Sequence, residues 1–346
     1  MNKAVLVLSV LVLSVVASAA AQPGRFRVMT YNVENLYDTC HDAGFDDTAF
    51  LPDGEQRWDG MRYATKLSRL WHVIAAAGGE SPLALVGLCE VENDSVVRDL
   101  CERTRLRRLG YRYVVTHSRD VRGIDVALLY QPELFSLFVT ECFVVPTDEH
   151  YGRPTRDLLH VGGVLPSGDT LDVIVCHMPS RRGGTVAAHR LRSQAALRLR
   201  GVADSLHSVR GICRLLILGD FNDEYMDSSI ACALGAVPLP AIGAGIRADR
   251  LYVLSAGLRA HSGITGSYKY RGKWNMLDQI MVCGHLLDPT ARMFVRRGDC
   301  RIFAPQFLLS PDEVHGGVKP RRTFLGPFYQ GGYSDHLPLI VDFTVR

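Results

Sequence analysis

The sequence predicts an α/β fold in which two packed sheets are flanked by helices. Short apolar segments that suit strands recur along the 346 residues, and a few long amphipathic segments that suit helices lie between them. No internal repeat, low-complexity tract or obvious linker interrupts the chain after its first residues. Many short strands with few helices favour this sandwich over a parallel doubly wound sheet. A hydrophobic content of 47% is enough for a large core.

The N-terminus predicts an export signal that is not part of the fold. Lys3 precedes an apolar run over residues 4–16, and small residues at 19–21 fit a cleavage site before Gln22. We therefore expect a signal peptide over residues 1–21, one domain over residues 22–346, and a periplasmic or extracellular monomer. The alternative is an uncleaved anchor, although the apolar run is short for a membrane span. After the signal is removed we expect no stable membrane insertion.

The first half of the chain predicts strands and helices in turn. Residues 24–33 favour a strand, and residues 38–57, rich in Asp, Gly and Thr, favour a loop. Apolar residues spaced three or four apart predict a helix over 58–77, which Gly78 and Gly79 end. Residues 83–91 are almost all apolar, as in a strand that is buried on both faces. A second amphipathic helix is expected over 96–109.

The remainder of the chain predicts mostly strands. One helix rich in Ala, Leu and Arg is expected over residues 186–206. The expected strands cover residues 111–116, 124–130, 134–143, 158–165, 171–177, 214–218, 266–270, 277–283 and 337–345.

Charge and cysteine content limit the possible functions. The net charge of +3, which becomes +2 once Lys3 is removed, is too small for a protein that coats nucleic acid by charge alone. Arginines cluster at residues 105–112, 181–182 and 321–322, where they could meet phosphate or form a solvated basic face. The nine cysteines include no C-x-x-C pair, so neither a zinc ribbon nor a thioredoxin-type site is indicated. An odd number leaves at least one thiol unpaired in a monomer.

Polar residues stand where apolar strands end, at six places in the chain. One buried carboxylate or imidazole is usually a structural hydrogen-bonding group, but six at separate strand ends favour a shared site. Strands of one sheet can bring their ends to one rim, and oxygen ligands gathered there suit Mg²⁺ or Mn²⁺. The residues are Asn32 with Glu34, Glu90, His177, Asp220 with Asn222, Asp278, and Asp335 with His336.

The order of these motifs resembles the endonuclease/exonuclease/phosphatase superfamily, of which DNase I is a member. The motifs are Tyr-Asn-Val-Glu-Asn at 31–35, Glu90, His-Met-Pro-Ser at 177–180, Gly-Asp-Phe-Asn at 219–222, Leu-Asp-Gln at 277–279 and Ser-Asp-His at 334–336. The resemblance covers residues 25–346. It implies a four-layer α/β/β/α sandwich, DNase I-like, and a Mg²⁺-dependent hydrolase acting on phosphoric esters, with Mn²⁺ as an alternative ion.

The resemblance also implies roles for the metal-binding residues. Glu90 matches the metal-binding glutamate of the superfamily. Glu34 stands where the family often has Asp, and would contact the metal directly or through water. Asp335 would help to bind it.

The remaining motif residues match groups that act on the substrate. Asn32 would bind phosphate and order the site, and His177 would donate to a phosphate oxygen. Asp220 and Asn222 match the pair that positions or activates the attacking water. His336 matches the histidine at the scissile phosphate, with Asp278 as its orienting partner. Whether Asp220 or the Asp278–His336 pair is the base stays open.

Other residues carry weaker signals. Arg156 and Arg181 suit substrate phosphate, with surface salt bridges as the alternative. Asp125 would orient His177 or serve as an ordinary buried hydrogen-bonding group. Trp274, close before Asp278, would stack a base or ring at the cleft, or belong to the core or surface.

Three functions follow, and the first is favoured. It is an exported nuclease that cleaves phosphodiester bonds, with nucleic acid as its substrate. The second is a phosphatase or phospholipase C-type enzyme acting on inositol, sugar or lipid phosphates; the sphingomyelinase variant would want an exposed aromatic hairpin, and the sequence shows no strong one. The third is a non-catalytic binding module with the same fold, which the complete motif set disfavours. No G-x-S-x-G is present for a serine hydrolase.

Overall fold

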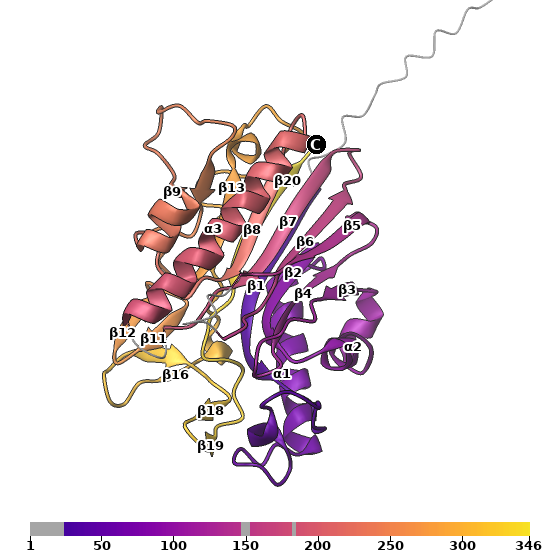
Figure 1. Ribbon diagram of the computed structural model, residues 1–346, viewed down its shortest axis with the longest axis vertical. Helices are drawn as coiled ribbons and strands as arrows, with labels where there is room; N and C mark the ends of the chain where they lie inside the picture. The colour runs from indigo at the N-terminus through magenta and orange to yellow at the C-terminus, as the bar shows by residue number, and fades with distance from the viewer. Residues whose placement is uncertain (1–23, 147–152, 182–184) are drawn as a thin grey trace, which may run out of the picture.

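The computed structural model describes residues 24–146, 153–181 and 185–346 (Figure 1). Two large mixed sheets pack face to face, with helices on their outer faces, as predicted. Helices α1 (Gly60–Gly78) and α2 (Asp94–Glu102) lie against the first sheet, and α3 (Thr185–Val209) lies against the second. The predicted signal peptide lies outside the described residues, in which no helix is long and apolar enough to cross a membrane.

The first sheet has the strand order β14-β20-β1-β2-β4-β3, and β15 also pairs with β20. Only β1 and β2 run parallel. Its strands are β1 (Gly24–Leu36), β2 (Leu85–Val91), β3 (Arg112–Val115), β4 (Asp125–Tyr130), β14 (Met293–Phe294), β15 (Cys300–Ile302) and β20 (Leu339–Val345).

The second sheet has the order β5-β6-β7-β8-β13-β10-β9. Strands β7 and β8 run parallel, as do β9 and β10, and the other neighbours are antiparallel. Its strands are β5 (Ser136–Phe143), β6 (Leu158–Val164), β7 (Thr170–His177), β8 (Leu215–Asp220), β9 (Val237–Pro238), β10 (Leu251–Val253) and β13 (Asp278–Cys283).

Shorter elements occupy the long segments between the sheet strands. Three two-stranded hairpins are β11 (Tyr268–Tyr270) with β12 (Lys273–Asn275), β16 (Leu309–Pro311) with β17 (Val318–Pro320), and β18 (Phe324–Leu325) with β19 (Phe328–Tyr329). The short helices are η1 (Thr48–Phe50), η2 (Arg105–Leu109), η3 (Ser229–Leu234), η4 (Gly284–Leu287) and η5 (Gln306–Leu308).

Local capping sets the helix boundaries. The Asp59 side chain accepts from the Met61 and Arg62 amides at the start of α1. The single helix predicted over 96–109 is wrong, because α2 ends at Glu102 and the Thr104 hydroxyl then caps η2 by accepting from the Leu106 amide. A competing cap thus divides a segment whose apolar spacing is continuous.

The two sheets pack tightly against each other at Gly87 in β2. A Cβ atom there would lie 2.0 Å from Leu218 Cδ1 on β8, so only glycine fits without a shift. Strands β1 and β2 contact β7 and β8 across this core. The C-terminal ends of these four strands therefore lie near one another. Cys89, Cys176, Cys213 and Cys283 are buried, and all nine cysteines are free thiols.

Candidate active site

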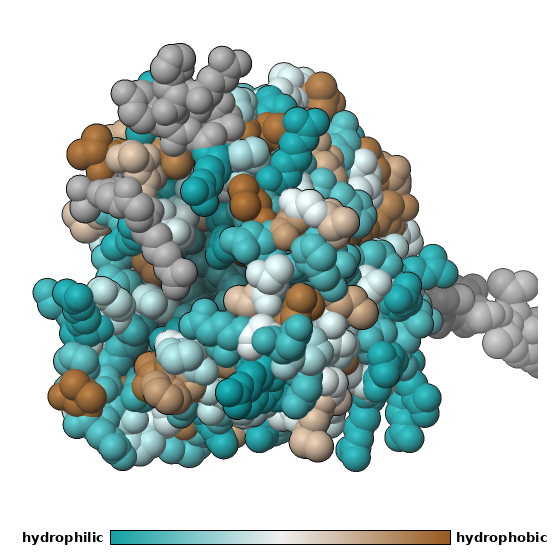
Figure 2. All heavy atoms as spheres, turned by 60° about the horizontal axis from the view of Figure 1, so that its bottom comes forward, coloured by the Kyte–Doolittle hydropathy of each residue, from teal (hydrophilic) through white to brown (hydrophobic). Residues whose placement is uncertain are grey.

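Strand register brings most of the predicted site residues together. On the second sheet His177 of β7 pairs with Asp220 of β8, which pairs with Asp278 of β13. On the first sheet Asn32 of β1 pairs with Cys89, one residue before Glu90. The face of the molecule toward which β1 runs is hollowed, and mainly hydrophilic residues border the hollow (Figure 2).

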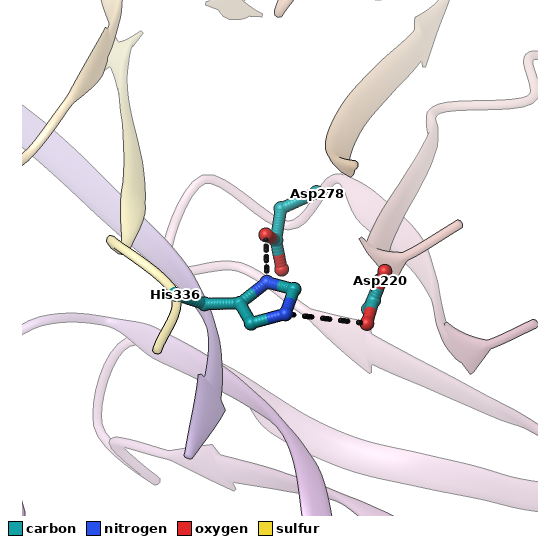
Figure 3. Close-up of side chains that lie close together, drawn as sticks. All are labelled: Asp220, Asp278 and His336. Carbon is teal, nitrogen blue, oxygen red and sulfur yellow. Dashed lines mark hydrogen bonds and ion pairs between the residues drawn. The ribbon is translucent and has the colours of Figure 1, made fainter. Parts of the chain in front are cut away.

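Asp278 and His336 form a buried carboxylate–imidazole pair (Figure 3). Asp278 Oδ2 lies 2.6 Å from His336 Nδ1, and Asp220 Oδ2 lies 3.9 Å from Nε2. Burial alone would lower the pKa of His336, but the charges of Asp278 and Asp220 raise it well above its ordinary value. His336 is therefore held as an imidazolium whose Nε2–H points toward Asp220 and the site.

Two amides hold Asp220 in place. The Asn32 Nδ2 donates to Asp220 Oδ2 at 3.0 Å, and the Asn222 backbone amide donates to Oδ1 at 2.8 Å. Asn222 has a positive φ of 51°, an uncommon conformation that often marks functional sites. Burial raises the pKa of Asp220 to about 7; His336 opposes this shift and Asp278 adds to it. Asp220 can thus take up or release a proton near neutral pH.

Glu90 and His177 form the other side of the site. Glu90 has a φ of 65°, and its Oε2 accepts from the Asn35 amide at 2.9 Å. His177 Nε2 lies 3.9 Å from Glu90 Oε1 and 3.6 Å from Asp220 Oδ2. Burial, reinforced by the charges of nearby arginines and His336, lowers the pKa of His177 well below its ordinary value. His177 is therefore neutral and can donate a single hydrogen bond from Nε2.

Glu34 is buried and already has several donors. The amides of Thr323 and Phe324 donate to its carboxylate, and Arg322 Nε lies 3.4 Å from Oε1. Arg322 also donates to Asp335 Oδ2 at 3.0 Å. Burial and the charge of Asp335 raise the pKa of Glu34 to about 7. The Arg322 guanidinium thus lies between the two carboxylates that were predicted to help bind metal.

Two groups of side chains in this site could hold a divalent cation. The Glu90 side chain is 16% exposed, and its Oε1 makes no hydrogen bond within the described part of the chain. Carboxylate oxygen is the donor that Mg²⁺ and Mn²⁺ prefer. The ligand atoms of Asp220, Asp278 and His336 also lie within 4.8 Å of one another. The 2.6 Å hydrogen bond to Asp278 already occupies His336 Nδ1, whereas Glu90 Oε1 is available to hold a cation.

The two arginines that were predicted to contact substrate phosphate form hydrogen bonds within the protein. Arg156 is buried, and its guanidinium donates to Asp120 at 2.8 Å and to the Met178 carbonyl at 2.6 Å. Arg181, whose side chain is 43% exposed, donates to the Asn222 carbonyl at 2.7 Å and to Asp227 at 2.8 Å. Their hydrogen bonds therefore brace the segments that follow β7 and β8.

The orienting role predicted for Asp125 is wrong. Its Oδ1 accepts from the Thr116 hydroxyl at 2.6 Å and the Ser118 amide at 2.9 Å. His177 Nδ1, the ring nitrogen that an orienting carboxylate would bind, has no hydrogen-bond partner among the described residues. Asp125 is the buried structural group that the alternative interpretation described.

Several residues near the site carried little or no signal in the sequence. Arg122 lies close enough to His177 for its charge to lower the pKa of that imidazole. Burial lowers the pKa of Arg122 itself, but nearby carboxylates, Glu90 first, raise it above its ordinary value. Lys66 is 1% exposed on the inner side of α1, where its Nζ donates to Thr323 Oγ1 at 2.6 Å. The only feature of the sequence that could have singled out Lys66 is its position within the apolar stripe of a predicted helix.

Comparisons with known proteins agree with this fold. Residues 27–344 match the model of the endonuclease/exonuclease/phosphatase family. No curated protein sequence matches. Similar solved structures include the human Nocturnin catalytic domain with bound sulfate, at 18% identity and a TM-score of 0.55, covering 94% of this chain and 98% of that one.

Two further similar structures are named for different substrates or products, a sugar phosphate and DNA. The mannosyl-6-phosphatase of Bacteroides thetaiotaomicron is 17% identical with a TM-score of 0.55, covering 92% of this chain and 98% of that one. D. rerio TDP2, complexed with a single-strand DNA product, is 15% identical with a TM-score of 0.54, again covering 92% and 98%. At these identities the structural likeness shows the fold alone.

Proposed function

Because the chain belongs to the endonuclease/exonuclease/phosphatase family, we propose that it is an exported, divalent-metal-dependent phosphodiesterase that cleaves nucleic acid. The observation that carries the proposal is the buried Asp278–His336 pair facing Asp220, with Glu90 and His177 beside it. Export, which rests on residues 1–21, and the monomeric state are parts of the same proposal.

The site supplies the groups that phosphodiester hydrolysis requires. A phosphodiester is anionic, so its charge must be neutralised before a nucleophile approaches. The imidazolium of His336 and the Nε2–H of neutral His177 can each donate to a phosphate oxygen. A Mg²⁺ or Mn²⁺ ion at Glu90 would add positive charge at the phosphoryl group and leaving oxygen.

Asp220 is the group best placed to accept the proton of the attacking water. Its pKa of about 7 lies where a general base is effective at neutral pH. The Asn32 and Asn222 amides fix its two oxygens. Attack on a phosphoryl group is in line, so the base and the leaving-group helper must stand on opposite sides of the phosphorus. In this proposal Asp220 would act on the attacking water, and a cation held by Glu90 would stabilise the leaving oxygen.

A phosphatase or phospholipase C-type enzyme acting on inositol, sugar or lipid phosphates is the second candidate. One structural neighbour is named a mannosyl-6-phosphatase and another is a TDP2 bound to a single-strand DNA product, so this fold is found with both kinds of substrate. Both candidates use the same phosphoryl chemistry, and family members hydrolyse phosphoester bonds. They differ in the substrate, which is a nucleic acid for the first and a sugar, inositol or lipid phosphate for the second.

A substrate panel separates the two candidates. Residues 22–346 would be incubated with Mg²⁺ and single-stranded DNA, RNA, bis-p-nitrophenyl phosphate, mannose 6-phosphate, inositol polyphosphates or sphingomyelin, with Asp220→Asn as the control. Cleavage of DNA or RNA that is lost in the control is the expected result. Release of inorganic phosphate or choline phosphate with intact nucleic acid would reject the nuclease and support the second candidate.

A further inference from the structure

The β11–β12 hairpin lies beside the site, and its register fixes which side chains share a face. Tyr268 pairs with Asn275, Lys269 with Trp274, and Tyr270 with Lys273. Paired residues of an antiparallel hairpin point to one face, and successive residues point to opposite faces. The turn at Arg271 and Gly272 has positive φ angles of 47° and 81°, which suit a two-residue hairpin connection.

One face of the hairpin packs away from the site. Lys269 Nζ donates to the Val318 carbonyl at 3.0 Å and pairs with Asp312 at 2.8 Å. It also lies 5.8 Å from the Trp274 ring centroid, which confirms that both side chains share this face. The placement of Trp274 as a stacking group at the cleft is therefore wrong. Trp274 packs with Lys269 toward the β16–β17 hairpin.

The opposite face continues from the catalytic histidine. The Tyr268 ring lies 4.9 Å from the His336 ring, centroid to centroid, and an isolated backbone bridge joins these two residues. Tyr270 follows two residues later on the same face, a step of about 7 Å along a strand. Tyr270 is 55% exposed. This distance is of the order that separates successive bases in an extended single strand.

Positive charge borders the exposed tyrosine. Arg271 Cζ lies 5.3 Å from the Tyr270 ring centroid, and Lys273 is exposed directly opposite Tyr270. Within the described ranges, neither Arg271 nor Lys273 forms an ion pair, so both charges are available to an anionic ligand. An aromatic ring with unpaired cations around it is the arrangement that binds single-stranded nucleic acid.

We propose that the face formed by Tyr268, Tyr270, Arg271 and Lys273 binds the part of a single-stranded nucleic acid that flanks the scissile phosphate. A base stacks on Tyr270, and Lys273 and Arg271 contact the adjoining phosphates. This inference rests on the proposed function, since His336 defines where the scissile phosphate lies. It narrows the substrate to strands whose bases are unpaired and able to stack.

The test compares two strands that differ only in their bases. Binding of a fluorescein-labelled single-stranded deoxyoligonucleotide, and of an equally long strand of abasic sites, would be measured by anisotropy in the Asp220→Asn protein. Stacking on an aromatic side chain is worth about 1–3 kcal/mol, so Tyr270→Ala should weaken binding of the base-bearing strand by about fivefold or more. Binding of the abasic strand should not change, and Tyr270→Phe should bind both strands as Tyr270 does.

Two further variants separate stacking from charge and from general damage. Lys273→Ala should weaken the binding of both strands by the same factor and reduce the salt dependence of binding. Phe138→Ala is the matched control, because Phe138 is 46% exposed on β5 with Arg210 Cζ 5.2 Å from its ring centroid. It should bind both strands normally.

The outcomes decide the inference separately from the proposed function. Three results would overturn the role of this face. The first is that Tyr270→Ala binds the base-bearing strand as tightly as the protein that keeps Tyr270, and the second is that it loses the same affinity for both strands. The third result is that the protein binds no oligonucleotide at all. If the wild-type protein hydrolysed no phosphodiester while Tyr270→Ala still weakened the base-bearing strand selectively, the proposed function would fail and the binding face would stand.

Discussion

The substitution Asp278→Asn tests the most closely coupled pair in the site. It keeps the size of the side chain and removes the charge that His336 faces at 2.6 Å. A hydrogen bond to a charged group is worth about 1.5–3 kcal/mol net. If that stabilisation is used in the transition state, its loss lowers kcat by about 10- to 150-fold.

The same substitution moves the pH dependence in a defined direction. Burial lowers the pKa of His336, whereas Asp278 and then Asp220 raise it. Without the Asp278 charge the imidazolium loses its proton at lower pH. The alkaline limb of the pH–rate profile should therefore move to lower pH in Asp278→Asn.

The assay is the pH dependence of kcat and KM with bis-p-nitrophenyl phosphate, together with the histidine titrations followed by NMR. Asp172→Asn is the matched control, because Asp172 also forms a buried carboxylate–imidazole contact, 2.9 Å from His160 Nε2, on strands β6 and β7 away from the site. It should lose stability and keep the wild-type kcat. A wild-type kcat and an unmoved alkaline limb in Asp278→Asn would show that Asp278 does not set the protonation of His336, and equal losses of kcat in both variants would show a general effect on the fold.

Three other predictions concern the metal, a buried lysine and a glycine. Exhaustive chelation should abolish hydrolysis, Mg²⁺ or Mn²⁺ should restore it, and Glu90→Gln should require more Mg²⁺ for half-maximal rate; activity that persists in EDTA would contradict the metal role. Lys66→Met removes the 2.6 Å hydrogen bond to Thr323 and should lower the free energy of unfolding in urea by about 1–3 kcal/mol; an unchanged midpoint would reject that contribution. Gly219→Ala should yield no soluble folded protein by circular dichroism, because Gly219 has a φ of 142° and a Cβ would lie 1.8 Å from the Cys176 carbonyl oxygen; a folded, active variant would show that the strand can shift.

The sequence predicts the fold and the strand-end residues because both depend on local patterns. An apolar run that ends in a polar group is visible without knowing the partner strand. Asn32, Asp220 and Asp278 are examples, and the structure joins them through strand register and a 3.0 Å amide–carboxylate hydrogen bond. Their roles in catalysis stay predictions.

The residues that were missed or misplaced depend on contacts between distant segments. Arg322 lies between Glu34 and Asp335 only because residues 321–335 fold back against β1. The error at Trp274 has a different cause, since the face of a hairpin residue depends on the strand's phase, and a shift of one residue reverses it. Without β12 in the prediction, that phase was undefined.

The most direct test of the proposed phosphodiesterase is cleavage of an end-labelled single-stranded DNA in Mg²⁺ by the wild-type protein and by Asp220→Asn, with circular dichroism to show that both are folded. We expect products with the wild-type protein, and none above background with Asp220→Asn. Wild-type cleavage by folded Asp220→Asn would contradict the assignment of this site.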